Sequence, residues 1–181
     1  MKKESTLMYI IRLTVTLLLI CVVMAAALGG VNSITAPMIE QIKYEKTQAA
    51  VSAVLEGGGD PVDFPETANV TNVYQGANGY AVEVTPSGFG GTITMMVGVD
   101  NAGSVAGISI ISHAETAGLG DVAAAKTSAG EAFRGQFVGL NGTLSVTKDG
   151  GQVEAITSAT ITSRAVCDGV NTALAVVAAM G

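Results

Sequence analysis

Five hydroxyl side chains crowd the segment from Val153 to Val166, where they precede an apolar run with helical spacing. They are Thr157, Ser158, Thr160, Thr162 and Ser163. The amino end of a helix has unpaired N–H groups and the positive end of a helix dipole, so it can hold a phosphate without a basic cluster. Ser and Thr are also common helix caps. From the residues alone, both a phosphate site and simple helix capping remain open.

The segment from Glu154 to Thr160 resembles the flavinylation motif of FMN-binding domains. That motif is an acidic residue, two residues of any kind, Ser or Thr, usually Gly, then Ala and an acceptor Thr or Ser; Ile161 to Val166 is also similar to members of the family. The resemblance places Thr160 at the acceptor position. It implies covalent FMN, joined through its phosphate by a dedicated flavin transferase, with Thr157, Ser158, Ala159 and Thr162 as neighbouring cofactor-binding residues.

The motif departs from the family pattern at two positions. Glu154 stands where Asp is usual, and Ser158 where Gly is usual. The longer carboxylate keeps the charge. A serine carries a conformational cost if the backbone there requires a positive φ.

A second group of reactive side chains lies in the segment from Ser112 to Asp121. The only histidine, His113, stands beside a carboxylate, a hydroxyl and two glycines, as is typical of functional loops. Glu115 or Thr116 is suited to the polar edge of a flavin ring. His113 alone is more often a hydrogen-bonded structural residue than a catalyst, and no nucleophile and base pair is present for a hydrolytic triad. We therefore expect no catalytic residue, and Cys21 and Cys167 offer neither metal-ligand spacing nor a disulfide framework.

This loop is similar to the His-x-Glu-Thr-Pro-Gly-Leu-Gly signature of the G subunit of Rnf complexes and of the C subunit of the sodium-translocating NADH:quinone reductase. Ala117 replaces the usual Pro. In those families the loop lies against the flavin, which implies FMN contacts for Glu115, Thr116, Gly118 and Leu119. An anchor, a stalk, a Gly-rich hairpin over Gly90 to Asp100, this loop and the acceptor motif follow one another in the same order.

Length and composition limit the architecture. The 181 residues are 49% hydrophobic, which allows one domain and an anchor. A net charge of -6 argues against a nucleic-acid partner. Four Phe, four Tyr and no Trp lead us to expect that a flavin ring would stack mostly on aliphatic, Gly and Thr surfaces.

The first thirty residues predict a membrane anchor. Leu13 to Gly30 carries no charge, while Lys2, Lys3 and Arg12 precede it. We expect residues 1–6 to be cytoplasmic and residues 7–30 to be a single transmembrane helix in the cytoplasmic (inner) membrane, with the rest of the chain outside. A cleaved signal peptide is the alternative, since Ala25 to Ala27 supplies small residues, but the apolar run is longer than usual for one.

The remaining patterns predict an α+β fold, an antiparallel sheet packed by helices. We expect a juxtamembrane helical stalk over 31–59, with Pro37 in a first turn, and an extracytoplasmic FMN-binding domain over 60–181. Its expected elements are hairpins of Val70–Tyr74 with Tyr80–Thr85 and of Thr92–Val99 with Ser104–Ser112, a short helix over Asp121–Gly130, a strand over Thr143–Thr147, and a last helix capped by Thr162 or Ser163.

These features and resemblances favour an electron carrier over an enzyme with its own substrate. The resemblance implies an Rnf-type complex that links ferredoxin and NAD to sodium or proton translocation, with other membrane and redox subunits as partners. Two alternatives stay open. One is a membrane-anchored scaffold or sensor domain without flavin, and the other is a stand-alone extracytoplasmic flavin carrier.

Overall fold

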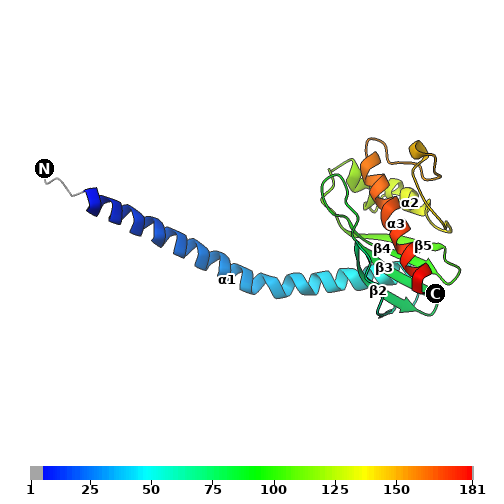
Figure 1. Cartoon of the computed structure of the whole chain (residues 1–181), viewed down its shortest axis with the longest axis horizontal. Helices are drawn as coiled ribbons and strands as arrows, with labels where there is room; N and C mark the ends of the chain where they lie inside the picture. Colours follow the sequence, from blue (N-terminus) through cyan, green and yellow to red (C-terminus); the bar gives the residue numbers. More distant parts are fainter. Residues whose placement is uncertain (1–5, 181) are drawn as a thin grey trace. The chain divides into compact units, whose positions relative to one another are not determined.

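The computed structural model describes residues 6–180 (Figure 1). Residues 1–44 and 45–181 form two units, and each is described by itself. Lys2 and Lys3, on which the expected cytoplasmic segment depends, lie outside the described residues.

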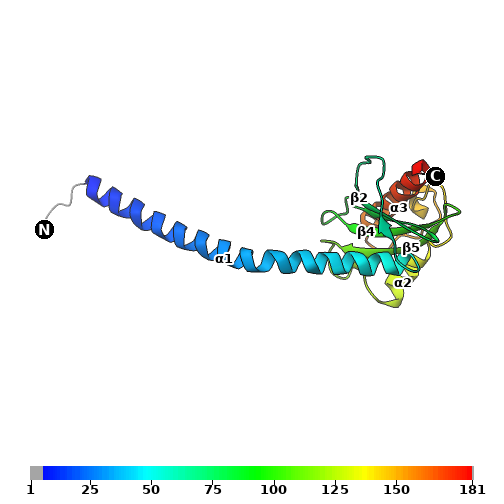
Figure 2. The ribbon, with the colours of Figure 1, turned by 90° about the horizontal axis from the view of Figure 1, so that it is seen from below.

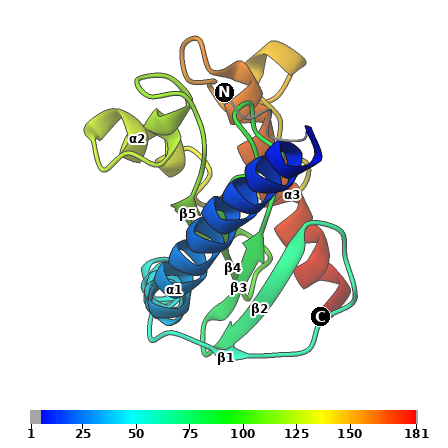
Figure 3. The same cartoon turned by 90° about the vertical axis from the view of Figure 1, so that its left-hand side faces the viewer.

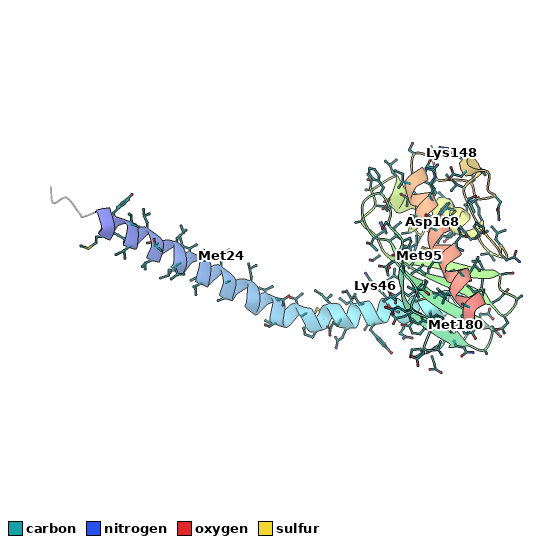
Figure 4. The ribbon with its side chains drawn as sticks, in the orientation of Figure 1. Met24, Lys46, Met95, Lys148, Asp168 and Met180 are labelled. Carbon is teal, nitrogen blue, oxygen red and sulfur yellow. The ribbon has the colours of Figure 1, made fainter. Side chains whose placement is uncertain are left out.

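The first element is one long helix, α1, from Thr6 to Val54. Within the described residues it is the one helix long and apolar enough to cross a membrane, and its apolar 18-residue stretch has a mean hydropathy of 2.5. Its apolar side chains are exposed along the membrane-length stretch, as the sticks around Met24 illustrate (Figure 4). Pro37 lies inside this helix, so the expectation that Pro37 begins a separate stalk helix is wrong. Nothing interrupts the helix at Gly29 and Gly30.

The folded unit is built on a five-stranded antiparallel sheet whose strands follow chain order (Figure 3). The strands are β1 Asp60–Pro61, β2 Val70–Gly76, β3 Gly79–Val84, β4 Thr94–Asp100 and β5 Val105–Ser112. Both expected hairpins are confirmed as the pairs β2 with β3 and β4 with β5. Central pairs such as Val82 with Val97 bring β-branched side chains opposite one another.

Helices cover both faces of this sheet (Figure 2). On one face, Val82, Val84, Met95 and Val97 pack against the last helix, α3, Thr160–Met180. On the other, Ala81 and Met96 pack with Ala50, Val51 and Val54, which belong to the carboxyl end of α1. Strand alternation explains this arrangement, since successive residues point to opposite faces. The packed unit therefore begins at Glu45, inside the segment assigned to the stalk.

The segment between the sheet and α3 departs from two expectations. Instead of one helix over Asp121–Gly130, a 3₁₀ turn η1, Gly120–Ala123, is followed by α2, Ser128–Gly135, because the Thr127 hydroxyl caps α2 by accepting from the Gly130 N–H at 3.4 Å.

The strand expected over Thr143–Thr147 is absent from the described chain, where Val146 makes only an isolated parallel bridge to Val153. The Asn171 side chain explains this difference. It accepts from the Leu144 N–H at 2.7 Å and donates to the Leu144 carbonyl at 2.8 Å, so it replaces a neighbouring strand.

Candidate functional site

A cavity of about 330 Å³ lies where the first turn of α3 meets the loop after β5 and the turn before β4. Segments far apart in sequence supply its lining, which is Phe89, Glu115, Thr116, Leu119, Gly120, Ser158, Ala159, Thr160, Ile161 and Thr162. The expected acceptor and the expected ring-contacting loop therefore share one cavity.

Ser163 organises the chain before α3. Its hydroxyl accepts from the Ile156 N–H and donates to the Ala159 carbonyl, each at 3.0 Å. This folds the 156–159 turn back onto the helix, which begins at Thr160. Thr162 and Ser163 thus lie inside the first turn as buried residues, and the expectation that one of them caps the helix is wrong.

The entrance of α3 leaves backbone donors free. In the described part of the chain, the N–H groups of Thr160, Ile161 and Thr162 have no hydrogen-bond partner, whereas that of Ser163 bonds the Ala159 carbonyl at 3.0 Å. These donors are the ones that a helix leaves unsatisfied at its amino end, where its dipole favours an anion. The half-buried Thr160 side chain belongs to the same turn.

Ser158 has a φ of 63°, in the left-handed region. This is the position where the flavinylation motif usually has glycine. A Cβ is strained in this conformation, which gives a physical reason for the usual glycine and shows that the chain accepts the cost here.

Glu115 joins three segments around the cavity. Its Oε1 accepts from the Gly90 N–H at 3.0 Å, and its Oε2 accepts from the Thr162 hydroxyl. A Cβ at Gly120 would lie 2.6 Å from Oε2, so the carboxylate fills space that only a glycine leaves open. His113 has a structural contact, since its Nδ1 accepts from the Glu115 N–H at 3.2 Å.

Phe89 is a lining residue that sequence reasoning did not single out. It sits on the turn in which the Gly88 N–H bonds the Gly91 carbonyl at 2.8 Å, and its side chain is 69% exposed. With Leu119 and Ile161 it forms an apolar rim, and it is the one aromatic residue in a lining that otherwise includes aliphatic, Gly and Thr residues. The position of this aromatic residue between Gly88 and Gly90 was the sequence feature that could have identified Phe89 as a site residue.

Gly118 and Thr157, two other expected site residues, line a neighbouring and more open hollow together with Glu154 and α2. The Gln136 side chain holds this part of the motif by accepting from the Glu154 N–H at 2.7 Å and donating to its carbonyl at 3.2 Å. These residues therefore line a different hollow from the cavity that contains Thr160.

A second residue missed from sequence is Lys148. Its Nζ donates to Thr160 Oγ1 at 3.1 Å, so an ammonium group is hydrogen-bonded to the hydroxyl at the acceptor position of the motif. Figure 4 shows Lys148 at the end of α3 opposite to Met180.

These residues fit a flavin mononucleotide. The cavity is within the usual size range of small-molecule sites, roughly 300–1,000 Å³. Its apolar rim suits a flat ring, and the free N–H groups of Thr160, Ile161 and Thr162 suit a phosphate.

The comparisons with known proteins agree with this geometry. Residues 88–175, which include every residue that lines the cavity, match the family of FMN-binding domains. The chain is 33% identical to the G subunit of the ion-translocating oxidoreductase complex of Methanosarcina acetivorans, over 94% of this chain and 95% of that protein. The chain belongs to the family of G subunits of Rnf-type ion-translocating oxidoreductases.

Two further relatives carry more specific names. The chain is 30% identical to the G subunit of the Na(+)-translocating ferredoxin:NAD(+) oxidoreductase complex of Acetobacterium woodii, over 92% of this chain and 91% of that protein. It is 33% identical to the G subunit of the proton-translocating ferredoxin:NAD(+) oxidoreductase complex of Clostridium ljungdahlii, over 96% of this chain and 95% of that protein. As a member of this family, the chain has an FMN-binding domain and an electron-transfer role in a multi-subunit ion-translocating oxidoreductase.

Proposed function

We propose that the chain is a membrane-anchored flavoprotein subunit that carries FMN covalently on Thr160 and relays electrons within a ferredoxin:NAD oxidoreductase complex. Electron flow through that complex drives sodium or proton translocation. The observation that carries the proposal is the position of Thr160, whose hydroxyl lies in an apolar-rimmed cavity beside three unpaired backbone N–H groups.

Bound FMN would supply the redox chemistry, accepting and releasing electrons. The chain's own residues would hold it. Phe89, Leu119 and Ile161 would contact the ring, and the N–H groups of Thr160, Ile161 and Thr162 would bind the phosphate oxygens. Glu115, fixed by Gly90 and Thr162, would place a negative charge next to the ring and set its potential.

Attachment requires a flavin transferase and an FMN donor with a leaving group on phosphorus. A bond forms from Thr160 Oγ to phosphorus as the bond to the leaving group breaks, and the hydroxyl proton is released. The protein gains the mass of FMN less one water. A tether is useful outside the cytoplasm, because it keeps the cofactor at a high local concentration where free flavin would be lost by dilution.

The anchor would be α1, crossing a lipid bilayer once in the cytoplasmic membrane. Its apolar stretch is long enough to span, and Arg12 lies near its amino end. The positive residues Lys2, Lys3 and Arg12 favour a cytoplasmic amino terminus and an extracytoplasmic FMN-binding domain over 60–181.

Co-expression with a flavin transferase tests the attachment. Wild type should fluoresce on a denaturing gel, and peptide mass mapping should place the flavin on Thr160. Thr160→Val should lose both signals because the nucleophilic oxygen is gone, while Thr160→Ser should keep much of each.

Neighbouring hydroxyls serve as controls. Thr157→Val should retain flavin, since Thr157 lies outside the cavity that contains Thr160. A wild type without flavin, made with an active transferase, would favour the flavin-free scaffold instead. Flavin found on Thr157 or Ser158 would show that the site assignment is wrong.

A further inference from the structure

The turn that precedes the acceptor motif meets α3 through two adjacent side chains. This turn, η2, spans Thr147–Asp149. Lys148 Nζ lies 3.1 Å from Thr160 Oγ1, and Asp149 pairs with Arg164 through contacts of 2.6 Å and 2.7 Å. Thr160 and Arg164 are four residues apart and so share one helix face. The bidentate pair therefore holds η2 in the register that brings Lys148 to the acceptor hydroxyl.

The backbone around η2 is held firmly as well. Val146 and Val153 on either side of the turn are fully buried in the main core, and the Thr147 N–H bonds the Val153 carbonyl at 2.8 Å. Gly151 approaches Ser145 so closely that a Cβ there would overlap the Ser145 carbonyl. Lys148 is thus carried by a fixed turn, although its own side chain is exposed.

Lys148 forms no salt bridge among the described residues, where the one salt bridge joins Arg164 to Asp149, and its charge acts on Asp149 only at longer range. Asp149 neutralises Arg164, so Lys148 is the cation that faces the acceptor. Lysine binds phosphate as a point charge, and such a contact gains strength as charge builds on the transferring phosphoryl group.

We propose that Lys148 is a phosphate-positioning residue for flavin attachment. Its ammonium group binds the phosphate of the incoming flavin nucleotide at Thr160 Oγ and then remains the counter-ion of the finished phosphodiester. This inference rests on the proposed attachment at Thr160.

The step is a phosphoryl transfer from a flavin dinucleotide such as FAD. The bond from Thr160 Oγ to the FMN phosphorus forms while the bond from that phosphorus to the bridging pyrophosphate oxygen breaks. AMP leaves with the bonding electron pair, and the hydroxyl proton passes to solvent. Lys148 neither gains nor loses a proton in this step, since its positive charge only binds and orients the phosphate.

The test uses the full chain in detergent with flavin transferase and FAD, and follows AMP release and protein fluorescence. Lys148→Gln should lower kcat for attachment about tenfold, the size expected for one charged hydrogen bond, with little change in the KM for the acceptor protein. Lys148→Arg should restore most of the rate because it keeps the charge. The attached flavin of Lys148→Gln should show a shifted ³¹P resonance relative to wild type.

Lys46→Gln is the matched control, since it makes the same charge change at an exposed lysine of α1 that Figure 4 shows well apart from Lys148. Flavin should be attached to this variant at the wild-type rate.

Three results would overturn the inference: an unchanged rate in Lys148→Gln, an equal loss in Lys148→Arg, or a raised KM with normal kcat, which would indicate transferase docking instead. If those results occur while wild type still carries flavin on Thr160, only the role of Lys148 fails. If wild type takes no flavin, the attachment proposal fails as well.

Discussion

At the scale of single residues, Ser158 shows how a motif position depends on backbone geometry. Its φ of 63° costs an L-residue about 1–2 kcal/mol. Ser158→Gly removes this strain, partly offset by the larger entropy of glycine in the unfolded chain. We expect the melting temperature of the folded unit to rise by about 3 °C in a thermal unfolding scan.

Ser158→Ala is the matched control for this prediction. It keeps the Cβ and hence the strain, and the Ser158 hydroxyl has no hydrogen bond among the described residues whose loss would confuse the result. A melting temperature that rises equally in Ser158→Ala and Ser158→Gly would mean that strain at this position is not the cause.

At the scale of elements, the carboxyl end of α1 belongs to the core of the folded unit. Val54 lies over the sheet at Gly98 of β4, where an added Cβ would overlap the Val54 carbonyl oxygen. At Gly107, the cross-strand partner of Gly98, a Cβ would lie 3.8 Å from the nearest Val54 atoms, which is an ordinary contact. The two glycines therefore differ in how closely the helix approaches them.

This difference predicts unequal effects for the same substitution. Gly98→Ala should destabilise the folded unit by about 1–3 kcal/mol, because the helix end must move away from the sheet. Gly107→Ala should change stability by about 0.5 kcal/mol or less. Denaturant unfolding of both variants measures the contrast, and similar values for the two would contradict the close packing of Val54 on β4.

At the scale of the whole molecule, the proposed topology makes a separate prediction. One uncharged span preceded by Lys2, Lys3 and Arg12 should leave the folded unit outside the cytoplasmic membrane. Protease added to intact spheroplasts should digest residues 60–181. The idea would be abandoned if that segment were protected until lysis while a known extracytoplasmic protein in the same sample was cleaved.

Local patterns in the sequence determined much of this protein. Alternation of apolar residues predicted both hairpins, because the period of a strand is visible in any short window. The uncharged run from Leu13 to Gly30 predicted the apolar helix, because the length and composition of such a run are visible in the sequence itself. The order of residues from Glu154 to Thr160 was enough to single out Thr160 as the proposed acceptor, because the resemblance to the flavinylation motif lies within seven consecutive residues.

Tertiary structure decided which residues surround Thr160. Lys148 and Phe89 come from turns with no periodicity of their own. The pair of Asp149 with Arg164 holds the turn that brings Lys148 to the Thr160 hydroxyl, and the bond from the Gly90 N–H to Glu115 holds the turn that brings Phe89 to the cavity. Asn171 of α3 satisfies the backbone of Leu144 and thereby removes the expected strand. The packing of Val54 on Gly98 draws the end of α1 into the folded unit. Each of these contacts joins residues distant in sequence, so no local pattern contains them.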